Sequence, residues 1–136
     1  MFLKIEDIIY DCTSYEQIGV VHKPRWISLS DYTLWENEDL ISFFGYKDQS
    51  SIENSDEFVR LFSVDIIGLE KEFMKLFSFK EQCAVQLSAE NTNYDNAFLC
   101  FIDHHNQISQ WCEFKHMHLV NAAIEWCKKN HIRYRI

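Results

Sequence analysis

The fold class follows from the C-terminal stretch, residues 97–136, which reads AFLCFIDHHNQISQWCEFKHMHLVNAAIEWCKKNHIRYRI. Residues 97–102 are apolar throughout, as in a central strand that is covered on both faces. Residues 108–114 alternate better between apolar and polar side chains. The sequence DHHN at residues 103–106 has the composition of a turn. We therefore predict a β-hairpin over these two segments.

The same stretch continues with a helix and a short strand. Apolar residues in the segment 119–129 lie on one helical face, and two lysines at its end suit the negative end of the helix dipole. Asn130 can take the left-handed conformation that ends a helix. Residues 132–136 alternate between apolar and basic side chains, and residues 83–87 are a further candidate strand. The C-terminal half is therefore predicted to be a small sheet with one helix.

The N-terminal half is predicted to be mainly helical. Residues 5–9 carry isoleucines at helical spacing. Ser28 or Ser30 can cap a later helix that carries Asp31 in its first turn. Asp65 can cap a clearer helix, in which apolar residues recur at three- and four-residue steps.

Weaker signals lie between these helices. Residues 19–28 are predicted to be extended, and the apolar cluster at residues 40–44 is followed by Gly45, which can end a helix. Asn54 and Glu57 have the spacing of a capping box. Together these patterns predict an α+β fold, in which a mostly helical N-terminal half packs on a small, mainly antiparallel sheet with one C-terminal helix.

The composition fits a single folded domain, residues 1–136, because 47% of the residues are hydrophobic and 15% are aromatic. No apolar run approaches the roughly 20 residues that a membrane-spanning helix needs. Glu6 and Asp7 interrupt the apolar N-terminus, so it does not resemble a secretory signal. Five cysteines without a C-x-x-C pair indicate reduced thiols that mostly pack as small apolar side chains. We expect a cytoplasmic protein.

The negative charge is concentrated in the N-terminal part of the chain. Residues 1–57 carry 12 acidic and 4 basic residues, whereas residues 58–136 carry 9 of each, so the whole net charge of −8 belongs to the first segment. This asymmetry disfavours nucleic acid as a ligand, because phosphates attract the opposite charge. It fits either ordinary solvated surface charge or a negative face that meets a positively charged protein.

Acidic and aromatic residues are interleaved between residues 31 and 46. The centres of protein interfaces favour aromatic anchors that are surrounded by polar groups. Helix capping and core packing are the alternative interpretation of the same pattern. We predict that the partner-binding residues are Asp31, Trp35, Glu36, Glu38, Asp39 and Tyr46.

Four histidines form the strongest candidate metal site. His104 and His105 lie in the predicted turn, and His116 and His118 lie at the predicted strand-to-helix junction, with Cys112 or Asp103 nearby. Zinc prefers imidazole and thiolate ligands. However, the sequence has neither an H-E-x-x-H nor a C-x-x-C motif, and helical residues two positions apart point to nearly opposite faces. We expect neither a metal nor another cofactor.

Catalytic chemistry has no diagnostic motif in this sequence. The three glycines cannot form either of the common phosphate-binding loops. A nucleophilic pair of Cys100 or Cys112 with a nearby histidine is the alternative, against the expectation that both cysteines are buried in strands. We predict no catalytic residue, and a small enzyme that depends on a metal or on Cys and His remains an alternative.

Two C-terminal segments, WCEFK at residues 111–115 and AAIEWC at residues 122–127, resemble the bacterial immunity proteins of contact-dependent inhibition and related polymorphic toxin systems. The small size, acidity and aromatic content are similar as well. This resemblance implies a protein partner: a toxin domain, commonly a nuclease and often basic, that is neutralised by stoichiometric binding. It assigns no binding residue in this chain. A homo-oligomeric adaptor subunit is the other alternative.

Overall fold

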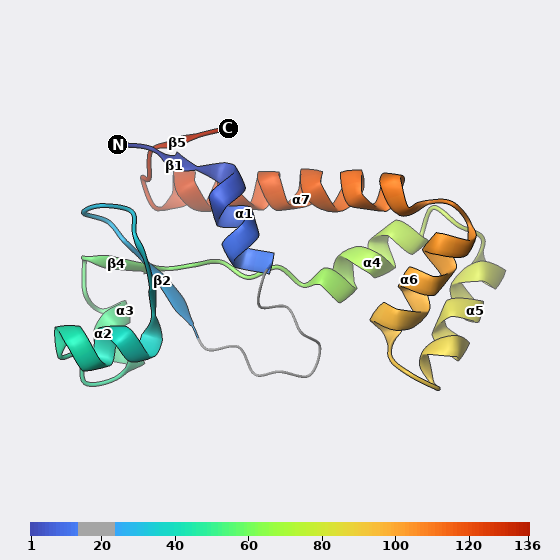
Figure 1. Ribbon diagram of the computed structural model, residues 1–136, viewed down its shortest axis with the longest axis horizontal. Helices are drawn as coiled ribbons and strands as arrows, with labels where there is room; N and C mark the ends of the chain where they lie inside the picture. The colour runs from blue at the N-terminus through green and yellow to red at the C-terminus, as the bar shows by residue number, and fades with distance from the viewer. Residues whose placement is uncertain (14–23) are drawn as a thin grey trace. The chain divides into compact units, whose positions relative to one another are not determined.

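The computed structural model describes residues 1–13 and 24–136 (Figure 1). The first part of the segment expected to be extended, residues 19–23, lies outside them. The chain forms two compact units, one of residues 1–64 and 120–136 and the other of residues 65–119. The predicted α+β class is confirmed, since helices accompany a small antiparallel sheet and a long C-terminal helix.

The first unit holds the strands. Its elements are β1 (Leu3–Lys4), α1 (Ile5–Thr13), β2 (Arg25–Ser28), β3 (Leu34–Glu36), α2 (Asn37–Phe44), α3 (Gln49–Glu53), β4 (Phe58–Arg60) and β5 (Tyr134–Arg135). The second unit contains α4 (Ile66–Met74), α5 (Phe79–Ala89) and α6 (Tyr94–His104). Helix α7 (Ile108–Lys129) contributes its first half to the second unit and its second half to the first.

The central sheet of the first unit has the order β3-β2-β4, and both pairings are antiparallel. Trp26 on the middle strand is only 1% exposed, and its indole N–H donates to Asn37 Oδ1 at 3.1 Å. Leu40, Ile52 and Phe58 complete the buried cluster around it. The sheet therefore buries one apolar cluster beneath the two short helices α2 and α3.

The predicted first helix is confirmed as α1, whose isoleucines at positions 5, 8 and 9 are buried. Its preceding strand β1 pairs in parallel with β5, so the final predicted strand is confirmed in part of its length. The indole N–H of Trp126 on α7 donates to the backbone oxygen of Arg60 at 2.9 Å. This bond holds the C-terminal half of α7 against the end of β4.

The second unit is a bundle of helices with well-formed N-termini. Asp65 caps α4 as predicted, by accepting from the Gly68 backbone N–H at 3.0 Å. Ser78 and Glu81 form a capping box at the start of α5, and Asn93 caps α6. Helices α5 and α6 lie side by side (Figure 1). The core of this unit consists of Phe73, Met74, Val85, Ala97, Phe98, Ile102 and Trp111.

Three of the four strands predicted for the C-terminal half were wrong. Residues 83–87 lie in α5, residues 97–102 in α6 and residues 108–114 in α7. A short apolar run fits a buried helix as well as a strand, and here Leu99 and Cys100 are exposed, so the run is covered on one side only. The predicted hairpin turn is instead the connection between α6 and α7, where Asn106 has φ of 54°.

The sheet therefore lies in the half that was predicted to be helical. No helix follows Ser30, because the chain turns at Tyr32, which has φ of 58°, and enters β3. The capping box proposed for Asn54 and Glu57 was wrong as well, since the residues that follow it form β4. Gly45 ends α2 in the left-handed conformation as predicted, with φ of 74°. At the end of α7 the left-handed residue is His131, one position after the predicted one.

Candidate functional site

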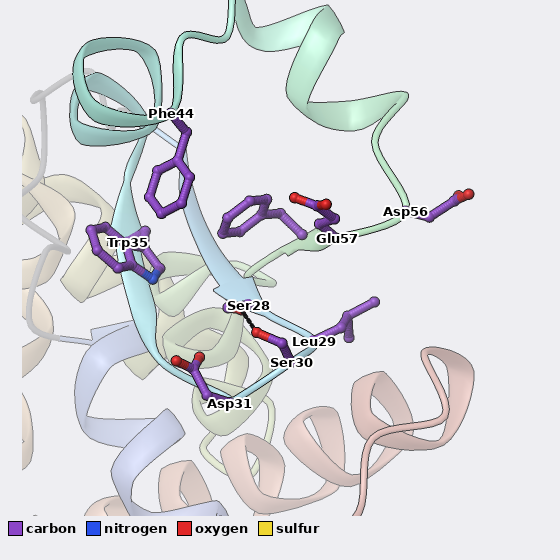
Figure 2. A pocket seen from close by; sticks show the side chains of 9 residues that line it. Ser28, Leu29, Ser30, Asp31, Trp35, Phe44, Asp56 and Glu57 are labelled. Carbon is purple, nitrogen blue, oxygen red and sulfur yellow. Dashed lines mark hydrogen bonds between the residues drawn. The ribbon is translucent and has the colours of Figure 1, made fainter.

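The first unit contains a pocket of about 540 Å³ beside the central sheet (Figure 2). It lies where the turn after β2, the strand β3, the end of α2 and the start of β4 meet. The register of the sheet pairs Ser28 with Phe58 and thereby brings two segments that are far apart in the sequence to the same place. Both of these residues line the pocket and are buried.

One wall of the pocket is aromatic. The rings of Trp35 and Phe44 meet edge to face, with centroids 5.1 Å apart and an interplanar angle of 88°. Phe44 continues to Phe58 at 5.6 Å, and Phe58 continues to Tyr46 at 5.9 Å. Phe44 is 49% exposed although it contacts a ring on each side. These rings form a continuous wall because each is in direct contact with the next.

A chain of hydrogen bonds connects this wall to a carboxylate. The indole N–H of Trp35 donates to Thr33 Oγ1 at 2.8 Å, and the same hydroxyl donates to Asp31 Oδ1 at 2.6 Å. The Thr33 backbone N–H also donates to Asp31 Oδ1, at 3.1 Å. These bonds from Thr33 lower the pKa of Asp31 below its ordinary value. The Asp31 carboxylate is therefore ionised at neutral pH and fixed beside Trp35.

The opposite rim carries two further carboxylates, on Asp56 and Glu57. Glu57 accepts a hydrogen bond from the Tyr46 hydroxyl at 3.3 Å, and that hydroxyl also lies 3.0 Å from Ser55 Oγ. Figure 2 shows the Glu57 carboxylate beside the aromatic wall, whereas the Asp56 side chain points away from it. Among the described residues that line the pocket, none is basic.

Two of the sequence-predicted binding residues, Asp31 and Trp35, line the pocket. Tyr46 adjoins it through its ring contact with Phe58 and its bond to Glu57. The remaining three do not line it. Glu36 ends β3, and Glu38 and Asp39 occupy the first turn of α2.

The sequence interpretation did not assign the other side of the pocket to a site. Glu57 was interpreted only as part of a capping box, and Asp56 counted only toward the negative charge of residues 1–57. Their approach to Asp31 depends on the pairing of β2 with β4, which no local pattern specifies. The bond from Tyr46 to Glu57 is likewise a long-range contact. The nearby interleaving of acidic and aromatic residues was the usable signal.

The four histidines lie on two helices. His104 ends α6 and His105 follows it, whereas His116 and His118 lie within α7. His105 Nδ1 is 2.8 Å from the Phe101 backbone oxygen, and the His118 ring makes the equivalent contact with residue 114 at 3.0 Å. Within residues 1–13 and 24–136, no group of three or more histidine, cysteine or acidic side chains is arranged to hold a metal ion.

The cysteines differ from the expectation of packed thiols. Cys83, Cys100 and Cys112 are exposed on helices, so the prediction that Cys100 and Cys112 are buried in strands was wrong. Cys127 is buried on the inward face of α7, and burial raises the pKa of its thiol to about 11.

No helix in the described part of the chain is long and apolar enough to cross a membrane.

The second unit holds a buried acidic group. Glu70 on α4 is 1% exposed, and its Oε1 has no hydrogen-bond partner. Burial raises the pKa of Glu70 to about 9, with smaller contributions from a hydrogen bond with Asp95 and from the charge of Asp95. Glu70 is therefore protonated at neutral pH, and its carboxyl O–H donates a hydrogen bond to the Asp95 side chain. Burial and Glu70 together raise the pKa of Tyr94.

Comparison with protein-family models, with curated proteins and with solved structures finds no match to this chain.

Proposed function

We propose that this chain is an immunity-type binding protein that neutralises a basic protein toxin by stoichiometric binding. The observation that supports this proposal best is the pocket of the first unit, which combines an aromatic wall with the carboxylates of Asp31, Asp56 and Glu57 and has no basic residue among its described lining. Aromatic anchors within a charged rim are typical of the energetic centres of protein interfaces.

The charge distribution supports the same partner chemistry. Apart from Phe58, the residues that line the pocket belong to residues 1–57, which carry the whole net charge of −8. A negative surface of this kind speeds the encounter with a positively charged protein and discriminates against acidic proteins. Occlusion of the toxin requires no cofactor and no catalytic residue in the inhibitor.

The test is affinity capture from the native host with the intact tagged chain and two matched variants. The first is Asp31→Asn with Asp56→Asn and Glu57→Gln, which neutralises the pocket. The second is Glu36→Gln with Glu38→Gln and Asp39→Asn, which removes the same charge outside the pocket lining. We expect one basic protein at near-equimolar yield with the unmodified chain and with the second variant, but not with the first.

The captured partner is then expressed with and without the intact chain. The proposal predicts that the partner alone arrests growth and that co-expression restores growth. A partner that is harmless, or one that the pocket variant still retains in full, would contradict the proposal.

A second candidate, a homo-oligomeric adaptor subunit, is supported by the outer face of α5. Phe79 is 80% and Leu87 66% exposed, and each lies four residues from the exposed Cys83. This spacing is symmetric about Cys83, so two antiparallel copies of α5 can pair the phenylalanine of one with the leucine of the other. Light scattering of the purified chain tests this candidate. A monomer at every concentration would exclude it, and a dimer that Phe79→Ser dissociates would favour it.

A further inference from the structure

The volume of the pocket limits the size of the group that it can bind. A volume of about 540 Å³ lies within the range of about 300–1,000 Å³ that is typical of ligand pockets. The pocket can therefore admit one long side chain together with part of the backbone that carries it.

The charge of the pocket selects a cation. Asp31 is held ionised by Thr33, and Glu57 presents a second carboxylate beside the aromatic wall (Figure 2). A neutral or anionic occupant would remove water from these carboxylates without replacing their hydrogen bonds, which is unfavourable. The hydroxyls of Ser28 and Ser30, 2.9 Å apart, add neutral polar groups and no positive charge.

The arrangement of the rings discriminates among cations. Trp35, Phe44 and Phe58 touch in sequence at 5.1 and 5.6 Å, so no space remains between them for a quaternary ammonium ion in an aromatic cage. They offer a wall instead. A guanidinium group can lie with its face against such a wall and donate hydrogen bonds in its own plane, whereas an ammonium group is more strongly hydrated and does not stack.

The Asp31 carboxylate completes this geometry. Both bonds from Thr33 reach its Oδ1 atom, and an ionised carboxylate has about four acceptor sites, so it can accept further bonds. Because Thr33 also binds the indole N–H of Trp35, the ring and the carboxylate are held together as one unit. A planar cation that stacks on Trp35 thus has a fixed acceptor beside its edge.

We propose that this pocket binds an arginine side chain of the partner, stacked on Trp35 and paired with Asp31. This inference rests on the proposed function and names the chemistry by which that partner is held. Glu57 adds negative charge from the opposite rim, and the exposed face of Phe44 extends the stacking surface.

The test is a nuclear magnetic resonance titration of the intact chain with N-acetyl-arginine amide, in which the indole N–H signal of Trp35 is followed. The citrulline amide, a neutral molecule of nearly the same shape, and the lysine amide are the matched probes. We expect saturable shifts with the arginine amide, about tenfold weaker binding of the lysine amide and no shift with the citrulline amide. Asp31→Asn and, separately, Glu57→Gln should weaken arginine binding about tenfold and fivefold respectively.

Two controls protect this test. Glu113→Gln removes one exposed charge in the second unit and should leave the titration unchanged. The amide spectrum of the central sheet verifies that each variant is folded, and the Glu57→Gln result serves if Asp31→Asn disturbs the turn.

The inference is overturned if the citrulline amide binds as well as the arginine amide, if lysine matches arginine, or if no probe shifts the Trp35 signal. Its failure is separable from that of the proposed function. A toxic basic partner that the chain captures, together with an unresponsive pocket, would leave the function standing and remove the inference. If the pocket binds the arginine amide but no toxic basic partner is captured, the arginine specificity of the pocket stands and the proposed function is removed.

Discussion

Replacement of the buried Glu70 by glutamine should stabilise the protein at neutral pH. The pKa of Glu70 is about 9 in the folded chain, against an ordinary value of 4.5. The folded state therefore binds this proton more tightly than the unfolded state, and the associated stability is fully present below pH 4.5 and is lost as the pH rises toward 9. pH 7 lies about 2.5 pH units above the ordinary pKa of 4.5, so the free energy of unfolding is lower there by about 3 kcal/mol than at acidic pH.

The glutamine variant avoids this loss because it has nearly the same shape and no proton to release. Its amide can still donate to Asp95, as the protonated Glu70 does. We expect equal stability of the variant and the natural chain near pH 4 and an advantage for the variant that grows to about 3 kcal/mol at pH 7.

The assay is urea unfolding followed by circular dichroism between pH 4 and pH 9. Glu113→Gln, an exposed change on α7, is the matched control and should show no pH-dependent gain. If the stability of Glu70→Gln and that of the natural chain run parallel over this pH range, then the buried and protonated state assigned to Glu70 is wrong.

Three further results are expected. A β-carbon at Gly68 would lie 2.6 Å from Asp65 Oδ2, so Gly68→Ala should disturb the helix cap and give no net increase in stability in thermal melts. In an Asp65→Ala background, where this clash is absent, the same substitution should raise the free energy of unfolding by about 1 kcal/mol. Equal effects in the two backgrounds would contradict this coupling. Ser78→Ala removes one half of a capping box and should cost about 1 kcal/mol in urea unfolding, and an unchanged midpoint would refute it. In mass-spectrometric alkylation, buried Cys127 should react at least about tenfold more slowly than exposed Cys83, and comparable rates would be inconsistent with its burial.

The sequence identified the fold class but misplaced its sheet. The run at residues 97–102 is too short for apolar content alone to separate a strand from a helix turn. Local capping chemistry carried the better signal, because Ser78 with Glu81 and Asn93 mark two helix starts that the strand assignment ignored. The true strands β3 and β4 are each three residues long, which is too short to show a two-residue periodicity.

Only the part of the pocket that is formed by residues close together in the sequence could be predicted. Asp31 and Trp35 lie four residues apart, so a local pattern of acidic and aromatic residues included both. Glu57 joins them only through the antiparallel pairing of β2 with β4, and register of this kind is set by the packed sheet as a whole. Glu38, in contrast, shares the local pattern but does not line the pocket. It lies in the first turn of α2, after the end of β3.

Whether the partner binds through the pocket is tested by its dissociation rate from the intact chain and from the two triply neutralised variants, measured at low and high salt. Contacts inside an interface act mainly on dissociation, whereas charges at its edge act mainly on association. We predict that neutralising Asp31, Asp56 and Glu57 speeds dissociation at least about tenfold, and that neutralising Glu36, Glu38 and Asp39 slows association only. Equal dissociation rates for all three proteins would show that the partner does not use the pocket.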